Sequence, residues 1–251
     1  MSGVNVSGNI ITNGGWTFAS GTGVVVEFAA NATIERNEIA FFSYTGISLG
    51  FSWTMDPQPM CGGHRVAHNH IHSLGVPRRE MADAMSGIYT LGDNANTVVE
   101  NNVIHDVKSY NTGGSGICAD SGSSRVRFHK NVVLRTTLEC IQMQGFNMSY
   151  TNNICYKGYW HSLSCPLVQQ PSGAVHFCPW HGGGILTASR TGDCGGKHFM
   201  PQLHGGASCP TRLTFSRNMV LQHQKDAFLM QGIWNESTEW GWSYSIDRNL
   251  W

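Results

Sequence analysis

The sequence predicts an all-β protein built as a right-handed parallel β-helix, a solenoid whose coils stack along one axis. The first observation is a recurring phrase, an Asn followed within two residues by an apolar residue that is most often Ile or Val. The phrase begins at Asn9, Asn37, Asn69, Asn102, Asn131, Asn153, Asn218 and Asn249. Successive spacings are 28, 32, 33, 29, 22, 65 and 31 residues. Self-similarity at intervals of about 20–50 residues is the signature of a solenoid.

The second observation is a pair of short strand patterns that repeat around this phrase. Before the Asn, one residue in two is apolar, which is typical of a strand with one packed face and one wet face. These strands are expected at residues 33–36, 64–67, 97–100, 125–128 and 213–216. A second family is expected at residues 46–50, 87–92 and 116–120. No stretch has the amphipathic period of a crossover helix, so the strands are expected to stack directly.

The Asn residues themselves are expected to have a structural role and not to belong to a functional site. Asn tolerates left-handed backbone and bonds neighbouring amides, so we expect it at the corners between strands. Side chains stacked in register can also hydrogen-bond from one coil to the next.

Composition is that of a folded chain and excludes several classes of function. Charged residues make up 13% of the chain and Gly supplies 30 of 251 residues. The formal net charge is zero, with no run of Lys or Arg, so we expect neither a nucleic-acid partner nor an anionic membrane surface. No stretch reaches 18 consecutive apolar residues, so no membrane insertion is expected. No cofactor is indicated.

The repeats predict one β-helix domain over residues 1–251, interrupted by a Cys-, His- and Gly-rich insertion loop at 156–210. That loop accounts for the long spacing of 65 residues in the Asn series. The repeat reaches both ends of the chain without an obvious cap, and a solenoid needs capped ends. We therefore expect the chain to be a fragment of a longer protein.

The eight Cys residues favour an oxidising compartment. Five of them bracket the insertion, where disulfides would staple a long loop: Cys155, Cys165, Cys178, Cys194 and Cys209. Acceptor sequons for glycosylation at Asn5, Asn31, Asn147 and Asn235 are compatible with a secreted glycoprotein. We therefore expect an extracellular or secretory-pathway location. Cys118 and Cys140 fall within predicted strands, where a small buried thiol is expected.

The insertion could instead bind a metal, because several histidines lie among its cysteines. These are His161, His176, His181, His198 and His204. Zinc sites use close ligand pairs such as Cys-x-x-Cys, and no such pair occurs here. Disulfides are therefore the favoured interpretation, and no metal ligand is assigned.

Four segments carry a family resemblance: 44–50 (YTGISLG), 87–92 (GIYTLG), 97–106 (TVVENNVIHD) and 116–124 (GICADSGSS). Together they resemble the right-handed parallel β-helix glycosidases, solenoids of the pectin-lyase-like kind. The match is to family 141 of the glycoside hydrolases and, more distantly, to family 120. The resemblance covers nearly the whole chain outside residues 156–210. It implies hydrolysis of a fucoside- or xyloside-type poly- or oligosaccharide substrate.

Glycoside cleavage needs two carboxyl groups that face each other across one sugar. Asp120 matches an Asp that the family presents before Gly-Ser-Ser, although here Ser121 replaces the neighbouring acid. Relatives place the second acid where this chain has Ala84, and Asp83 lies one residue earlier. Asp120 and Asp83 are therefore the predicted catalytic pair. Asp120 could alternatively only cap its turn, and the shift at Asp83 could mean that one catalytic acid has been lost.

Four further residues are expected to bind the sugar. Tyr89, Gln142 and Gln144 are expected to join Asp120 in one polar stripe, because their strands belong to neighbouring coils. Trp53 is a candidate platform for sugar stacking, although Trp is more often a packing residue.

Other ionisable residues near this stripe are expected to be structural or solvated. Glu80 and Glu139 are reserve acids, whereas His64, His72 and His105 flank turns near the stripe.

Two other classes of function stay open at this stage. A polysaccharide lyase or epimerase would use clustered acids for Ca²⁺ or a basic residue beside a uronate, and acids here are dispersed. A non-catalytic carbohydrate-binding β-helix would keep Asp120 and aromatic residues but lack the second acid. The distance between the two carboxyl groups discriminates among these classes.

Overall fold

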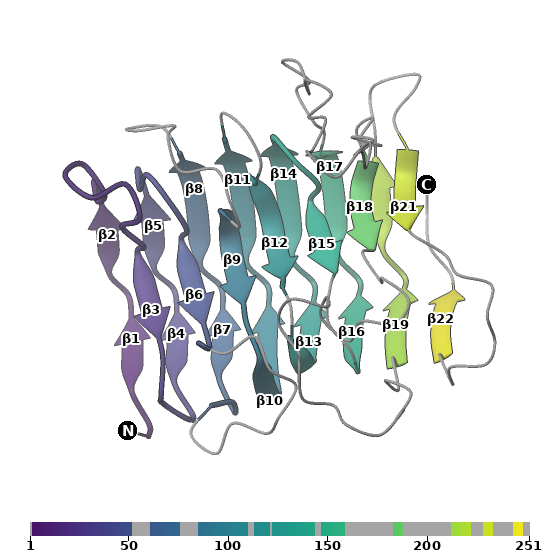
Figure 1. The fold of residues 1–251 in the computed structure, drawn as a ribbon, viewed down its shortest axis with the longest axis horizontal. Helices are drawn as coiled ribbons and strands as arrows, with labels where there is room; N and C mark the ends of the chain where they lie inside the picture. Colours follow the sequence, from purple (N-terminus) through teal and green to yellow (C-terminus); the bar gives the residue numbers. More distant parts are fainter. Residues whose placement is uncertain are drawn as a thin grey trace, which may run out of the picture.

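The computed structural model describes residues 2–51, 61–75, 85–109, 113–120, 122–143, 147–158, 183–187, 212–221, 228–232 and 243–247. Its strands form three sheets, and every pairing within each sheet is parallel. In Figure 1 the chain advances from the purple N-terminal coil to the yellow C-terminal strands, coil after coil along one axis. This is the right-handed parallel β-helix that the repeat predicts.

Each coil contributes strands to the three sheets in turn. The first sheet has eight strands: β1 (Asn5–Ser7), β4 (Thr33–Glu35), β7 (Arg65–Ala67), β10 (Asp93–Glu100), β13 (Ser124–His129), β16 (Met148–Thr151), β19 (Arg212–Ser216) and β22 (Ser243–Asp247). The second sheet has seven: β2 (Ile10–Thr12), β5 (Glu38–Ala40), β8 (His70–Leu74), β11 (Val103–Val107), β14 (Val132–Thr136), β17 (Ile154–Gly158) and β20 (Met219–Leu221). The third sheet also has seven: β3 (Val24–Val26), β6 (Ile47–Leu49), β9 (Ser86–Thr90), β12 (Ser115–Ala119), β15 (Ile141–Met143), β18 (Gly183–Thr187) and β21 (Phe228–Gly232).

The core consists of rows of apolar side chains that run from coil to coil inside the solenoid. Register pairs Ile39 with Ile71 and Ile71 with Ile104 in the second sheet, and all three are fully buried. In the first sheet, the rings of Phe128 and Tyr150 stack with centroids 4.7 Å apart. Burial of each such side chain stabilises the fold by about 1.5–3 kcal/mol. Alternation of apolar and polar residues therefore decides which face of each strand turns inward.

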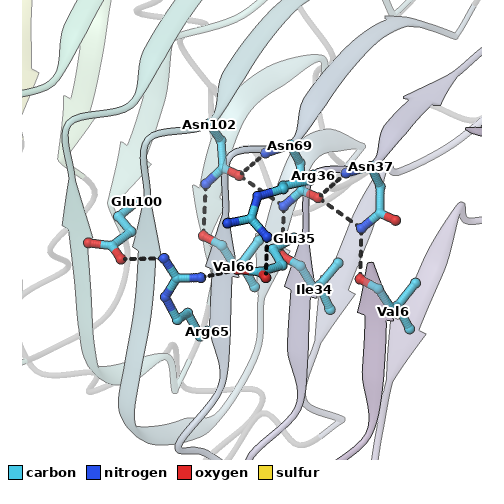
Figure 2. Close-up of polar contacts among 10 residues, drawn as sticks. All are labelled: Val6, Ile34, Glu35, Arg36, Asn37, Arg65, Val66, Asn69, Glu100 and Asn102. Atoms are coloured by element: carbon cyan, nitrogen blue, oxygen red, sulfur yellow. Dashed lines mark hydrogen bonds and ion pairs between the residues drawn. The ribbon is translucent and has the colours of Figure 1, made fainter. Parts of the chain in front are cut away.

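The predicted Asn ladder is present at the corner between the first and second sheets. The side-chain amide of Asn37 donates to Oδ1 of Asn69 at 3.0 Å, and Asn69 donates to Oδ1 of Asn102 at 3.0 Å. Each Oδ1 also accepts a backbone N–H from the coil before it, as Asn37 N to Asn69 Oδ1 at 3.1 Å. Figure 2 shows three rungs of the ladder and their bonds to the carbonyls of Val6, Ile34 and Val66. The ladder continues through Asn131 and Asn153 to Asn218.

The left-handed backbone at this corner belongs to the residue before the Asn, not to the Asn itself. Positive φ values occur at Gly8, Arg36, His68, Asn101, Lys130, Asn152 and Arg217. The expectation that Asn would adopt this conformation was therefore wrong. The preceding residue makes the turn, and the Asn side chain stays buried between coils. Most of these left-handed residues carry a side chain, which costs roughly 1–2 kcal/mol each.

Left-handed backbone also recurs at two further bends of each coil, four residues after and six residues before the ladder Asn, and several of these bends lie within strands. Positive φ follows at Asn13, Phe41, Ser73, Asp106, Arg135 and Lys157. It precedes the Asn at Gly3, Asn31, Gly63, Asn96, Arg125 and Asn147. The left-handed positions thus keep a constant spacing around the ladder Asn. The variation in repeat length lies in the rest of each coil, which includes the third-sheet strand.

Strand β18 lies within the stretch 156–210 that was expected to be one insertion loop. It pairs with β15 on one side and β21 on the other in the third sheet. Strand β17 also extends to Gly158. The stretch therefore supplies a regular strand to the solenoid, because its residues 183–187 continue the third sheet. The remainder of that stretch lies outside the described residues.

Cys140 and Cys155 form a disulfide with their Cα atoms 5.8 Å apart. The expectation of a thiol at Cys140 was wrong, and Cys155 bonds to Cys140, the residue before β15, rather than to a cysteine of the insertion. Both residues are buried and belong to the core. The bond links the beginning of β15 to β17, so it joins two sheets of the solenoid. Cys118 keeps a buried thiol, as expected. Cys165, Cys178, Cys194 and Cys209 lie outside the described residues.

Charged side chains bridge coils on the outside of the first sheet. Arg65 contacts both Glu35 and Glu100, the latter at 3.2 Å, and Figure 2 shows these ion pairs beside the Asn ladder. Opposite charges on three neighbouring coils favour a single register. In the part of the chain that the structure describes, no helix is long and apolar enough to span a bilayer.

Candidate functional site

The candidate site is built on the outer face of the third sheet. Register aligns Ser48, Tyr89, Cys118 and Gln142 across four consecutive coils, and we call these four residues the outer row. Their neighbours along each strand, such as Ile88 and Ile117, point inward and are fully buried in the core. Tyr89 and Cys118 form a small separate cluster with Leu91, outside the main core. The predicted alignment of Tyr89 with Gln142 is therefore present.

Asp120 follows the last residue of β12 and contacts Tyr89 directly. The phenol oxygen of Tyr89 donates to Oδ2 of Asp120 at 2.6 Å. The backbone of Asp120 is fixed as well, because its N–H donates to the carbonyl of Thr90 at 3.0 Å. Its carbonyl accepts from the N–H of Ser123 at 2.9 Å, which closes the following turn through the backbone. The Asp120 side chain is thus engaged with the outer row.

Tyr89 keeps its proton in this environment. Burial raises the pKa of the Tyr89 phenol far above its usual range, and the charge and hydrogen bond of Asp120 raise it further. The side chain is 9% exposed although it lies on the outer face of the sheet. A phenol that stays protonated at every working pH is a permanent donor to the Asp120 carboxyl group. It therefore fixes the orientation of that group.

Gln142 is held by its neighbours in the preceding coil. Its Oε1 accepts hydrogen bonds from Ser115 Oγ at 3.3 Å and from Cys118 Sγ at 3.3 Å. These contacts fix the side-chain amide at the end of the outer row. An immobilised amide can recognise a hydroxyl without losing much side-chain entropy on binding.

The other predicted site residues lie outside the described residues. These are the second catalytic acid Asp83 and the sugar-binding residues Gln144 and Trp53. The reserve acid Glu80 also falls there. The pairing of Asp83 with Asp120 therefore stays a prediction.

Glu139, the other reserve acid, is a buried residue distant from Asp120 along the sheet. Its carbonyl accepts from the N–H of Gly116, which places it at the start of β12, whereas Asp120 follows the end of that strand. Four residues of extended strand separate the two levels by about 13 Å. Burial raises the pKa of Glu139 to about 7, and its Oε2 has no hydrogen-bond partner among the described residues. Glu139 is therefore placed to affect stability rather than to act across a sugar from Asp120.

The three histidines flagged by the sequence have different environments. His64 is buried, and its Nδ1 accepts from the backbone N–H of Ala32 at 3.2 Å, which is a structural role. His72 and His105 lie on the outer face of the second sheet, paired in register on adjacent coils. Both belong to a group of side chains on the second sheet, whereas Asp120 follows a strand of the third sheet.

That group also contains Glu38 and His70, which sequence reasoning missed. Register pairs Glu38 with His70, and His72 with His105, on three neighbouring coils. Within each coil these residues stand one or three positions after the ladder Asn. Positions one and three after the Asn alternate with the inward-facing position two, so they share the outer face. The repeat register could therefore have identified the group from the sequence.

Comparisons with known proteins agree with the fold. A family model described as "Right handed beta helix region" matches residues 1–156. A search of curated proteins finds no match. One similar structure is described as "Glycoside hydrolase", with 25% identity, TM-score 0.48, and coverage of 63% of this chain and 25% of that chain. Another is an alginate lyase from Paenibacillus sp. str. FPU-7, with 14% identity, TM-score 0.59, and coverage of 98% of this chain and 68% of that chain.

The present chain thus spans a quarter of the length of that glycoside hydrolase. The match to the alginate lyase extends over nearly the whole chain and concerns the fold. The family match covers more than half of the chain and includes the outer row and the ladder residues up to Asn153. The chain belongs to the right-handed β-helix family.

Proposed function

We propose that this protein cleaves glycosidic bonds in a poly- or oligosaccharide and that Asp120 is one of its two catalytic carboxyl groups. The observation that carries the proposal is the 2.6 Å hydrogen bond from Tyr89 to Asp120 in the outer row. A carboxyl group oriented by a permanent donor is pre-organised for chemistry at a sugar. The resemblance of residues 116–124 to family 141 of the glycoside hydrolases supports the same assignment.

The proposed reaction uses Asp83 as the second carboxyl group. One group protonates the glycosidic oxygen as the bond to the leaving sugar breaks, and the other either attacks the anomeric carbon or activates a water. Because Tyr89 donates to Asp120, Asp120 suits the ionised role of nucleophile or base, and Asp83 the role of acid. A separation of about 5–5.5 Å would give retention at the anomeric carbon, and about 6.5–9.5 Å inversion.

The proposed substrate contacts follow the outer row. Gln142 is held by Ser115 and Cys118 and would bind a sugar hydroxyl, together with Gln144. Trp53 would supply a stacking platform. A fucoside or xyloside is the proposed substrate type, on the strength of the family resemblance. We also propose a secreted protein, because the Cys140–Cys155 disulfide is typical of an oxidising compartment.

The test is hydrolysis of aryl α-L-fucosides and aryl β-xylosides, followed by the corresponding polysaccharides. We expect turnover by the wild type and a loss of at least about a hundredfold in kcat/KM for Asp120→Asn. Glu100→Gln is the matched control, because it removes a surface carboxyl on the first sheet without touching the outer row. Sugar binding without turnover would replace the hydrolase proposal by a carbohydrate-binding one. An unsaturated product from a uronate polymer would replace it by a lyase.

A further inference from the structure

Four side chains that the proposed reaction does not use converge on the outer face of the second sheet. We call Glu38 of β5, His70 and His72 of β8, and His105 of β11 the histidine–glutamate cluster. Its members come from three consecutive coils and are brought together by the stacking register. Three imidazoles and a carboxylate are ligands that borderline divalent transition metals, zinc above all, prefer.

The distances within the cluster match those that a single ion requires. Ligand atoms of Glu38, His70 and His72 all lie within 4.8 Å of one another. His72 Nε2 lies 3.3 Å from Glu38 Oε1. Two ligands at about 2.1 Å from a tetrahedral zinc ion are about 3.4 Å apart, so this pair already has the spacing of two zinc ligands. Small rotations of exposed side chains would bring in the third ligand.

His105 stands beside these three from the next coil. Its Nε2 lies 2.8 Å from His70 Nε2, and its ring stacks on His72 with centroids 5.0 Å apart. Two imidazole nitrogens at this distance need a proton between them, since two lone pairs repel. A metal ion would replace that proton and accept both lone pairs. His105 is therefore placed to be a fourth ligand.

An outer layer of polar groups orients His105 for this role. Its Nδ1 lies 2.6 Å from Asp106 Oδ2, and Asp106 is clamped by Arg135 through contacts of 2.8 and 2.6 Å. Arg135 donates to both carboxylate oxygens of Asp106, so Asp106 is placed to accept a hydrogen bond from His105 Nδ1. Arg135 Nη2 also lies 3.1 Å from Nδ1, but the shorter contact to Asp106 decides the tautomer. With the proton on Nδ1, the lone pair of His105 is on Nε2, which faces the cluster.

We propose that Glu38, His70, His72 and His105 bind one divalent transition-metal ion of the zinc class. The ion would tie three neighbouring coils together on the second sheet, away from the Tyr89–Asp120 pair on the third. Its binding free energy would add to the stability of these coils, because the four ligands come together only in the folded chain.

The test uses the full chain, stripped with EDTA and titrated with zinc chloride by calorimetry, and in parallel with cobalt chloride by visible absorption. We expect one saturable site that raises the thermal midpoint and gives the intense absorption of tetrahedral cobalt. His70→Ala and His72→Ala should each remove this site. Asp106→Asn replaces the carboxylate by an amide, and Asn tolerates the positive φ of this position. This variant should weaken metal binding about 10–100-fold, as loss of an outer-layer partner does.

His68→Asn is the matched control, since it removes an imidazole from the same coil, keeps a residue suited to positive φ, and leaves the four ligands intact. It should bind zinc as the wild type does. Metal-free thermal midpoints and far-ultraviolet spectra of all variants establish that they fold. Histidines of the 156–210 stretch could also bind zinc, so the decisive quantity is the number of sites lost. Unchanged stoichiometry and affinity in the folded His70→Ala/His72→Ala double variant would overturn the proposal, as would a wild type that binds no metal.

Discussion

The phenol oxygen of Tyr89 lies 2.6 Å from Oδ2 of Asp120, a residue 31 positions further along the chain. The two side chains meet because Tyr89 in β9 is paired in register with Cys118 in β12, two residues before Asp120. One turn of the solenoid thus places a permanent hydrogen-bond donor against a carboxyl group at the end of a strand. This relationship is the basis of the proposed catalytic site and of the first prediction.

The Tyr89→Phe variant keeps Asp120 but removes the hydrogen bond that orients it. It therefore tests how much the orientation of Asp120 contributes to catalysis. We expect kcat to fall about 10–100-fold, because the carboxyl group loses the donor that fixes its position, while KM changes little. The free energy of unfolding should fall by about 1 kcal/mol through loss of one hydrogen bond. Steady-state kinetics and urea unfolding measure the two effects. A Tyr89→Phe enzyme with wild-type kcat would contradict a positioning role.

Removal of one rung from the Asn ladder should destabilise the solenoid strongly. Asn69 donates to Ile34 O and Asn102 Oδ1 and accepts from the backbone and side chain of Asn37. Asn69→Ala leaves several buried groups unpaired, at about 1–3 kcal/mol each, so we expect a loss of at least about 3 kcal/mol. Urea unfolding measures it. Asn9→Ala is the control at the exposed end of the ladder and should lower the free energy of unfolding by less. Equal losses in the two variants would mean that burial does not determine how much a ladder Asn stabilises the fold.

Stability should depend on pH through Glu139. Its pKa is raised by burial to about 7, whereas a Glu in the unfolded chain titrates near 4.3. The folded chain therefore holds this proton more tightly. The associated stability is fully present below about pH 4.3 and is lost as pH rises through about 7, by a total of roughly 3–4 kcal/mol.

The variant Glu139→Gln isolates this contribution, because it keeps the shape of the side chain and cannot ionise. The difference in unfolding free energy between the variant and the wild type should move in favour of the variant as pH rises from 4 to 8. Other titrating groups, the histidines included, cancel in this difference. A difference that is flat across this range would show that Glu139 is not the responsible group.

The Cys140–Cys155 disulfide should be detectable and stabilising. Peptide mapping without reduction should recover a cross-linked pair that contains these two residues. The bond closes a loop with a sequence separation of 15, so its removal should cost about 3 kcal/mol. The double variant Cys140→Ala/Cys155→Ala under urea measures this cost. Recovery of Cys155 linked to a cysteine of the 156–210 stretch would contradict the observed pairing.

The sequence by itself determined the solenoid, the Asn ladder and the two strand families. These features are local and repeated, so every coil carries the same alternation of apolar residues and the same Asn. The sequence pattern places the left-handed backbone one residue late, at the Asn, because an Asn explains a turn equally well by its backbone or by its side chain. Only the structure distinguishes the ladder bond of Asn69 from the positive φ of His68.

The candidate site was predictable to the extent that it follows the same register. Tyr89 and Gln142 align across coils because each occupies the outward position of a third-sheet strand. The contact of Tyr89 with Asp120 depends on how the chain leaves β12, and strand alternation alone does not specify that path.

The tertiary structure alone decided which interior positions meet across sheets and how close the side chains of neighbouring coils come. The Cys140–Cys155 bond connects two sheets of the solenoid, and spacing of cysteines along the chain does not reveal which interior positions face each other. The histidine–glutamate cluster joins Glu38, His72 and His105 over three coils whose spacings are 32 and 33 residues. The repeat register places these residues on one outer face, but it does not give the distances between their side chains. Stacking of the coils about 4.8 Å apart brings them within reach of one ion.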